Sequence, residues 1–199
     1  MRFSRSSNVD TRLVPWVPRA LGGPCVAVLL GTDHHPFDRL VRWSEALAAE
    51  SAEPWFVQHG STRLPRTLSG RRMLGGREVA SLMETVDVVI THGGPGLIME
   101  ARSARHTPIV VPRDPSHGEH VDGHQMTFAR HLEAEGKIHL VDSLDTLREA
   151  VELVRLMGRT NQDVSDARTR TTTRFGALVD ELHRQGPRPP RPPRLPRQR

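Results

Sequence analysis

Short apolar runs alternate with segments of helical periodicity along the middle of the chain. Five runs predict strands: residues 26–30, 55–57, 87–90, 108–111 and 138–141. The first of them, residues 26–30, is typical of a strand buried on both faces of a sheet. Between and after them, apolar side chains recur at helical spacing, which predicts amphipathic helices at residues 37–51, 79–86, 97–104, 127–135 and 144–156. Strands that alternate with helices predict an α/β domain with a parallel sheet, at residues 25–158.

The rest of the chain lacks this alternation. Residues 61–76 are rich in Arg, Gly and Ser, and we expect a loop or a short strand there. We expect residues 1–24 to be a poorly ordered extension without a signal peptide. Within residues 159–185, the apolar stripe Phe175, Leu178, Val179 and Leu182 predicts a terminal helix. The Arg- and Pro-rich residues 186–199 predict a disordered tail, with a basic anchor for an acidic membrane surface as the alternative.

Charge and composition narrow the class of protein. The formal net charge is +5, but five arginines and no acid lie after Pro187, so the rest of the chain is balanced. A balanced body argues against a broad nucleic-acid-binding face. The single cysteine, Cys25, makes no internal disulfide and is compatible with a reducing cytoplasm. No apolar run approaches the ~20 residues that a membrane-spanning helix needs.

Four polar loops follow predicted strands: residues 31–36, 59–62, 91–96 and 112–123. The carboxyl ends of parallel strands share one edge of a sheet, and open α/β sheets bind their ligands there. We therefore expect these loops to form one rim around a ligand.

The third loop carries the strongest local signal. The turn His92-Gly93-Gly94-Pro95-Gly96 joins a strand to a helix, and Glu100 follows one turn later. Glycines let backbone N–H groups approach an anion, and the helix N-terminus favours negative charge, so a diphosphate suits this turn. The Glu100 carboxylate has the chemistry to accept hydrogen bonds from ribose hydroxyls. The alternative is a tight connection with no ligand.

Two further loops carry candidate chemistry. After the first strand, Gly31, Thr32 and His34 bring backbone N–H groups, a hydroxyl and an imidazole to the rim, where His59 ends the second strand. The loop that leads into the fourth helix contains Arg113, His117, Glu119, His120, His124 and Gln125. Its three histidines suggest a zinc site as one reading, and hydrogen bonds to a sugar or phosphate as the other.

These ordered motifs resemble the C-terminal domain of glycosyltransferase family 28, over about residues 26–151. The likeness is closest to small bacterial exopolysaccharide transferase subunits, which are related to the catalytic subunit of the eukaryotic two-subunit UDP-N-acetylglucosamine transferase. The resemblance implies a Rossmann-like domain that forms the donor-binding half of a GT-B fold. In it, His92–Gly96 would hold the diphosphate, Glu100 the ribose and His124-Gln125 the donor sugar, while the 112–120 loop would flank the base.

The nucleotide-sugar-binding residues predicted in this way are Gly31, Thr32, His59, Gly93, Gly94, Gly96, Glu100, Arg113, Glu119, His120, His124 and Gln125. His34 and His92 are the candidate catalytic bases. The resemblance implies transfer of a sugar from a UDP-sugar to a lipid-linked or glycan acceptor, with inversion, together with a separate membrane-associated partner subunit. The expected location is the cytoplasm, at the inner face of the plasma membrane.

Two features qualify this function. Leu97 stands where relatives commonly carry Ser or Thr, which removes a hydroxyl that could bond a phosphate. The chain has no Asp-x-Asp pair to hold a metal on the diphosphate, so we expect neither a metal nor a cofactor. The alternatives are a non-catalytic nucleotide-sugar-binding subunit and a metal-dependent hydrolase that uses His117, His120 and His124.

Overall fold

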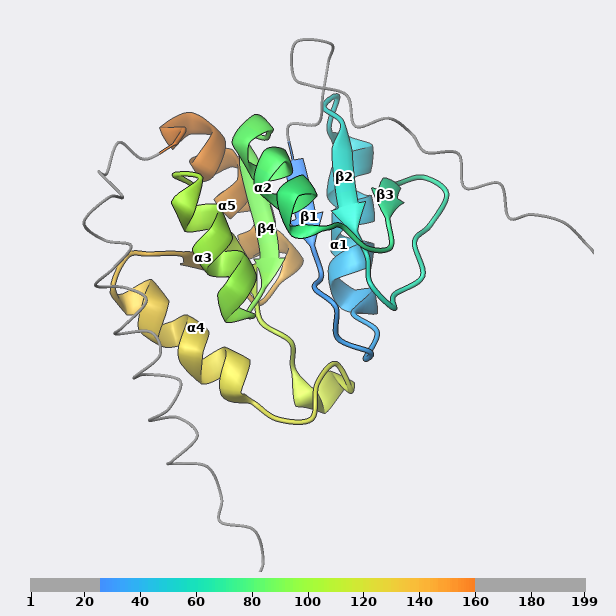
Figure 1. Ribbon diagram of the computed structural model, residues 1–199, viewed down its shortest axis with the longest axis vertical. Coiled ribbons are helices and arrows are strands. Elements are labelled where there is room, and N and C mark those ends of the chain that lie inside the picture. The colour runs from blue at the N-terminus through green and yellow to red at the C-terminus, as the bar shows by residue number, and fades with distance from the viewer. Residues whose placement is uncertain (1–25, 160–199) are drawn as a thin grey trace, which may run out of the picture. The chain divides into compact units, whose positions relative to one another are not determined.

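Parallel strands form the centre of the fold. The computed structural model describes residues 26–159, which form a six-stranded sheet in the order β3-β2-β1-β4-β5-β6 (Figure 1). The strands are β1 (Val26–Leu29), β2 (Trp55–Gln58), β3 (Ser69–Arg71), β4 (Val88–His92), β5 (Ile109–Val111) and β6 (His139–Leu140). All neighbouring pairs in this sheet are parallel, which confirms the predicted α/β class.

Helices connect the strands. They are α1 (Asp38–Glu50), α2 (Gly76–Thr85), α3 (Pro95–Ser103), α4 (His124–Ala134) and α5 (Leu144–Met157), with a 3₁₀ turn at Pro115–His117. Helices α2, α3 and α4 begin two or three residues before the predicted positions, because their first turns carry Gly, Pro and His and no apolar periodicity. None of the helices in this part of the chain is long and apolar enough to cross a membrane.

The central strand β1 shows how the core is divided. Val26 and Val28 belong to a buried cluster that includes apolar side chains of α1 and α5. The alternate residues Ala27 and Leu29 belong to a second cluster, with side chains of α2 and α3. Because successive side chains of a strand point to opposite faces, the sheet is covered on both sides.

The edge strand β3 lies in the segment predicted as a loop or a short strand. It pairs with β2, and a Cβ added to Gly70 would lie 2.1 Å from the Val57 carbonyl oxygen. This pairing needs a residue without a side chain at position 70, and Ser69 on this edge strand is exposed, so the segment has no apolar alternation. The predicted extension (1–24), terminal helix (175–182) and tail (186–199) lie outside the described residues.

Candidate functional site

The sheet reverses its direction of growth between β1 and β4. The chain adds β2 and β3 on one side of β1 and then returns to place β4 on the other side, with Leu29 paired to Thr91. A crevice outside the carboxyl ends of the strands at such a switch point is the usual ligand site of an open α/β sheet. The loop after β1 and the last residue of β4, His92, meet at this point.

The imidazole of His92 fills the space between two glycines. A Cβ added to Gly31 would lie 2.4 Å from His92 Nε2, and one added to Gly94 would lie 2.1 Å from His92 Cε1. Gly31 also has φ +79°, a backbone conformation that residues with a side chain rarely adopt. The glycines on the two sides of the switch point therefore make room for this one ring.

The same ring is neutral at neutral pH. Burial, and next the positive charge of Arg113, lower the pKa of His92 to about 4. The Gly94 N–H lies 3.1 Å from His92 Nδ1 and donates to it. In the neutral ring the proton is then on Nε2, which makes that atom a hydrogen-bond donor.

Gln125, the second residue of α4, joins the loop after β5 to this turn. Its Oε1 accepts a long hydrogen bond of 3.4 Å from the Arg113 backbone N–H and lies 3.4 Å from His92 Nδ1. A Cβ on Gly93 would lie 2.9 Å from the Cβ of Gln125, so this glycine also permits the close approach. The predicted residues His92, Gly93 and Gln125 therefore lie together.

Helix α3 begins at the switch point with an uncapped N-terminus. Gly94 is its N-cap and makes no side-chain capping hydrogen bond, and Pro95 has no N–H. The first-turn N–H groups of Gly96 and Leu97 have no partner within an α-helix, and they are the groups that bind anions at helix N-termini. The Leu97 side chain packs against the buried cluster that contains Ala27 and Leu29.

Gln58 holds the glycine turn after β1 in place. Its side chain accepts from the Gly31 N–H and donates to the Gly31 carbonyl, both at 3.0 Å, and it also donates to the Arg72 carbonyl. The sequence pattern gave no sign of this role, because Gln58 and Gly31 are 27 residues apart. The predicted residue His59 follows Gln58 in the sequence, and its Nδ1 lies 2.7 Å from the Thr62 carbonyl oxygen. The predicted residue Thr32 follows Gly31 and is exposed at the rim.

The buried Arg113 side chain connects the loop after β1 to the loop after β5. The residue is 1% exposed, and its guanidinium donates to the carbonyl oxygens of Leu30 (2.9 Å), His35 (2.8 Å) and Glu119 (3.0 Å). It also lies 4.8 Å from the centre of the Phe37 ring. Through these contacts Arg113 holds the loop after β1 against the loop after β5.

Glu119 has a similar role inside the protein. Its buried carboxylate accepts two hydrogen bonds from Arg39, at 3.0 and 2.7 Å, and one of 2.9 Å from the Asp114 backbone N–H. Such a paired, bidentate carboxylate is held in one orientation. Glu119 thus joins helix α1 to the loop after β5.

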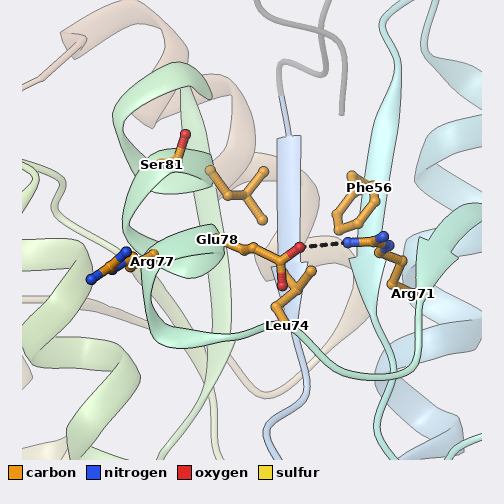
Figure 2. A pocket seen from close by; sticks show the side chains of 7 residues that line it. Phe56, Arg71, Leu74, Arg77, Glu78 and Ser81 are labelled. Carbon is orange, nitrogen blue, oxygen red and sulfur yellow. Dashed lines mark hydrogen bonds and ion pairs between the residues drawn. The ribbon is translucent and has the colours of Figure 1, made fainter. Parts of the chain in front are cut away.

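The structure has a pocket of about 310 Å³ beside these loops and another of about 310 Å³ away from them. One lies beside α1 and is lined mainly by polar residues, among them Arg39, Arg42 and His117. Figure 2 shows the other, between β2, β3 and α2, where the Phe56 ring and Leu74 lie near an ion pair of 2.6 Å between Arg71 and Glu78. This second pocket shares no residue with the turn at His92.

Comparison with known proteins identifies the domain. Residues 76–180, more than half of the chain, match the sequence profile of the Glycosyltransferase family 28 C-terminal domain. The chain belongs to this family. The matched residues include α3 with its glycine turn and the loop from Arg113 to Gln125.

Solved structures agree with the family 28 fold. The chain is similar to the glycotransferase of kitacinnamycin, with 21% identity, 81% of this chain covered and a TM-score of 0.52. It is also similar to the spinosyn forosaminyltransferase SpnP, with 17% identity, 66% of this chain covered and a TM-score of 0.50. These likenesses confirm the Rossmann-like fold of one half of a GT-B glycosyltransferase.

The chain spans 40% and 35% of the lengths of these two glycosyltransferases. No curated protein sequence matches the chain significantly.

The predicted site residues of this family 28 domain fall into two groups. Gly31, His92, Gly93, Gly94 and Gln125 are brought together at the switch point. The others lie on the same loops or on the helices that follow them: Thr32, His34, His59, Gly96, Glu100, Arg113, Glu119, His120 and His124. Contact of either group with a nucleotide-sugar stays a prediction.

Proposed function

We propose that this domain binds a UDP-sugar donor at the switch point between β1 and β4 and contributes the donor site of a glycosyltransferase. The observation that carries the proposal is the N-terminus of α3, which has no side-chain cap and lies next to the His92 ring, for which Gly31 and Gly94 leave space. Membership of glycosyltransferase family 28 supports the same assignment.

In this proposal the diphosphate lies at the start of α3. The N–H groups of Gly96 and Leu97 donate to phosphate oxygens, and the helix dipole adds about half a positive charge there. The neutral His92 ring donates from Nε2, in line with the tautomer that the Gly94 N–H selects. Glu100, in the same helix, accepts from the ribose hydroxyls, and Gln125 contacts the donor sugar.

The proposed reaction is a single displacement with inversion. The acceptor hydroxyl oxygen attacks the anomeric carbon, the bond from that carbon to the diphosphate oxygen breaks, and UDP leaves with the electron pair. A base takes the hydroxyl proton. Of the two candidate bases, His34 suits this task better, because its side chain is 84% exposed at the rim, whereas His92 is partly buried and has a pKa of about 4.

We also propose that a separate, membrane-associated chain supplies the acceptor site, and that the acceptor is a lipid-linked sugar. Two observations support a second half. The domain corresponds to one half of a GT-B fold, and it spans well under half the length of the two solved glycosyltransferases it matches. The resemblance to small exopolysaccharide transferase subunits supports a separate chain.

A non-catalytic nucleotide-sugar-binding subunit is the second candidate function. It is favoured by Leu97, whose partly buried side chain packs against the core at a position where relatives commonly offer a hydroxyl to the phosphate. A hydrolase with His117, His120 and His124 as metal ligands finds less support. Among the described residues, the group of three potential ligands whose side-chain atoms all lie within 4.8 Å of one another is Asp33, His34 and His35, and it contains none of these three histidines.

A transfer assay separates the first two candidates. The purified chain is incubated in EDTA with membranes of the source organism and radiolabelled UDP-glucose, UDP-galactose or UDP-N-acetylglucosamine, and label in the lipid fraction is measured. We expect incorporation from one donor above that of membranes alone, and its loss with Gly94→Ala but not with Gly136→Ala. Binding of a donor without any transfer would favour the non-catalytic subunit.

A further inference from the structure

A cluster of imidazoles and a carboxylate lies on the loops after β1 and β5. Side-chain ligand atoms of Asp33, His34 and His35 all lie within 4.8 Å of one another. From the second loop, His120 places its Nε2 3.7 Å from Asp33 Oδ2. His120 follows His35 by 85 positions in the sequence. The buried Arg113 side chain joins the two loops by donating to the carbonyl oxygens of His35 and Glu119.

The spacing of these atoms suits a metal ion. Ligand atoms about 2.1 Å from a tetrahedral Zn²⁺ lie about 3.4 Å from one another. Asp33 Oδ1 is 2.7 Å from His35 Nδ1 and 3.7 Å from His34 Nδ1, and the His120 contact is also 3.7 Å. Small side-chain movements therefore bring these ligand atoms to the distances of a tetrahedral site.

The surroundings of His120 provide an independent observation. Its second ring nitrogen, Nδ1, lies 3.3 Å from Asp122 Oδ1 and accepts a hydrogen bond of 3.3 Å from the Asp122 backbone N–H. A metal-ligating histidine usually donates its other ring N–H to a carboxylate. A metal on Nε2 requires the proton on Nδ1, so that Nδ1 donates to the Asp122 carboxylate in place of accepting from the Asp122 N–H; this carboxylate is close enough to orient the ligand.

We propose that Asp33, His34, His35 and His120 form a binding site for a zinc-like divalent cation. Three imidazoles and one carboxylate favour Zn²⁺, Co²⁺ or Ni²⁺ over Mg²⁺ and Ca²⁺, which prefer sets of oxygen ligands. Arg113 lies close enough to interact with Asp33, but its charge is also balanced by Glu119.

This site shares His34, the proposed base, and His120 with the predicted transferase residues, and His92 lies close enough to interact with Asp33 and His120. A metal bound there would leave His34 unavailable as a base, which is why the transfer assay is carried out in EDTA. The proposed metal site does not depend on the proposed glycosyltransferase function. The absence of an Asp-x-Asp motif does not bear on it either, because that motif supplies oxygen ligands from one segment, whereas this cluster draws on two loops.

Calorimetric titration of Zn²⁺ into tag-free protein, stripped with EDTA and then desalted, tests the proposal. We expect one Zn²⁺ per chain, with an affinity at least ~10-fold weaker in both His35→Gln and His120→Gln. His117→Gln is the matched control, since His117 is an exposed histidine of the same loop, and it should keep the affinity of the unmodified chain. Circular dichroism of each variant establishes that it is folded.

X-ray absorption at the zinc edge gives the second readout. We expect a first shell of nitrogen and oxygen atoms with the scattering pattern of imidazole rings, reduced in the His120→Gln variant. The proposal is overturned if Zn²⁺ does not bind saturably, if His35→Gln and His120→Gln bind as the unmodified chain does, or if His117→Gln weakens binding equally. UDP titration in EDTA tests the donor site without the metal, so the two proposals fail independently.

Discussion

The Nε2 atom of His92 lies where a side chain on Gly31 would be, only 2.4 Å from the position of an added Cβ. This relationship links the first and fourth strands at the point where the sheet changes direction. It explains why the loop after β1 must begin with glycine for packing reasons as well as for its positive φ.

Gly31→Ala should therefore lower the free energy of unfolding by more than backbone strain alone would. We expect a loss of at least about 2 kcal/mol in the free energy of unfolding, from the left-handed backbone and from displacement of the His92 ring. Gly136→Ala is the matched control, because Gly136 has φ +66° and open space around its Cβ position. Urea denaturation measures the free energy of unfolding of both variants. Equal losses in Gly31→Ala and Gly136→Ala would show that the His92 ring moves aside at no cost in stability.

His92 should make the fold sensitive to acid. Its folded-state pKa, about 4, lies below the ordinary value of 6.5, so the unfolded chain binds the proton more readily. The contribution to stability is complete above pH 6.5 and is lost as the pH falls toward 4, by up to about 3 kcal/mol. Urea denaturation between pH 7 and pH 4, in EDTA, measures this slope.

The slope should decrease in His92→Gln and persist in His131→Gln, which removes an exposed histidine of α4. A His92 resonance that titrates near 6.5 in NMR spectra would contradict the assignment of a neutral ring.

Arg113 should matter for stability more than its place in a polar loop suggests. Arg113→Ala leaves the Leu30, His35 and Glu119 carbonyls without their donor, and we expect a loss of about 3 kcal/mol or more. Arg113→Lys should rescue only part of this, because an ammonium group does not reproduce the planar fork. Thermal denaturation checks both, with Arg130→Ala, on the exposed face of α4, as a control expected within about 0.5 kcal/mol.

Leu97→Thr should move stability and ligand affinity in opposite directions. The new hydroxyl can donate to a phosphate, and we expect UDP to bind about 3- to 10-fold more tightly. The loss of packing against the buried cluster that contains Ala27 and Leu29 should lower stability by about 1 kcal/mol or more. Leu156→Thr, at an 86% exposed position, reports the cost of threonine in a helix alone. Unchanged UDP affinity would argue against a phosphate beside residue 97.

Much of the fold could be predicted from local pattern. Apolar runs such as Val26–Leu29 are buried on both faces and read as strands whatever their neighbours are. Edge strand β3 has the sequence Ser-Gly-Arg, with no apolar alternation, and it exists because Gly70 approaches the β2 backbone. That approach is a tertiary contact and leaves no periodic signal.

The candidate site was predictable only as a set of loops. The glycine turn at His92 could be recognised because its residues are adjacent in sequence. Arg113 hydrogen-bonds to Leu30, and Asp33 lies next to His120, across about 80 or more residues of sequence. Spacing along the sequence therefore gave no sign of either contact. The three histidines at 117, 120 and 124 were grouped by spacing, whereas the fold groups His120 with the loop after β1.

The central claim is that the N-terminal end of α3 holds a UDP-sugar, with Glu100 on the ribose. Calorimetric titration of UDP into the purified chain in EDTA tests it most directly, with Glu100→Ala and, as a matched control, Glu149→Ala on the exposed face of α5. We expect saturable binding of one UDP, about 10-fold weaker in Glu100→Ala and unchanged in Glu149→Ala. Binding that Glu100→Ala leaves as tight as before, or no binding at all, would contradict the claim.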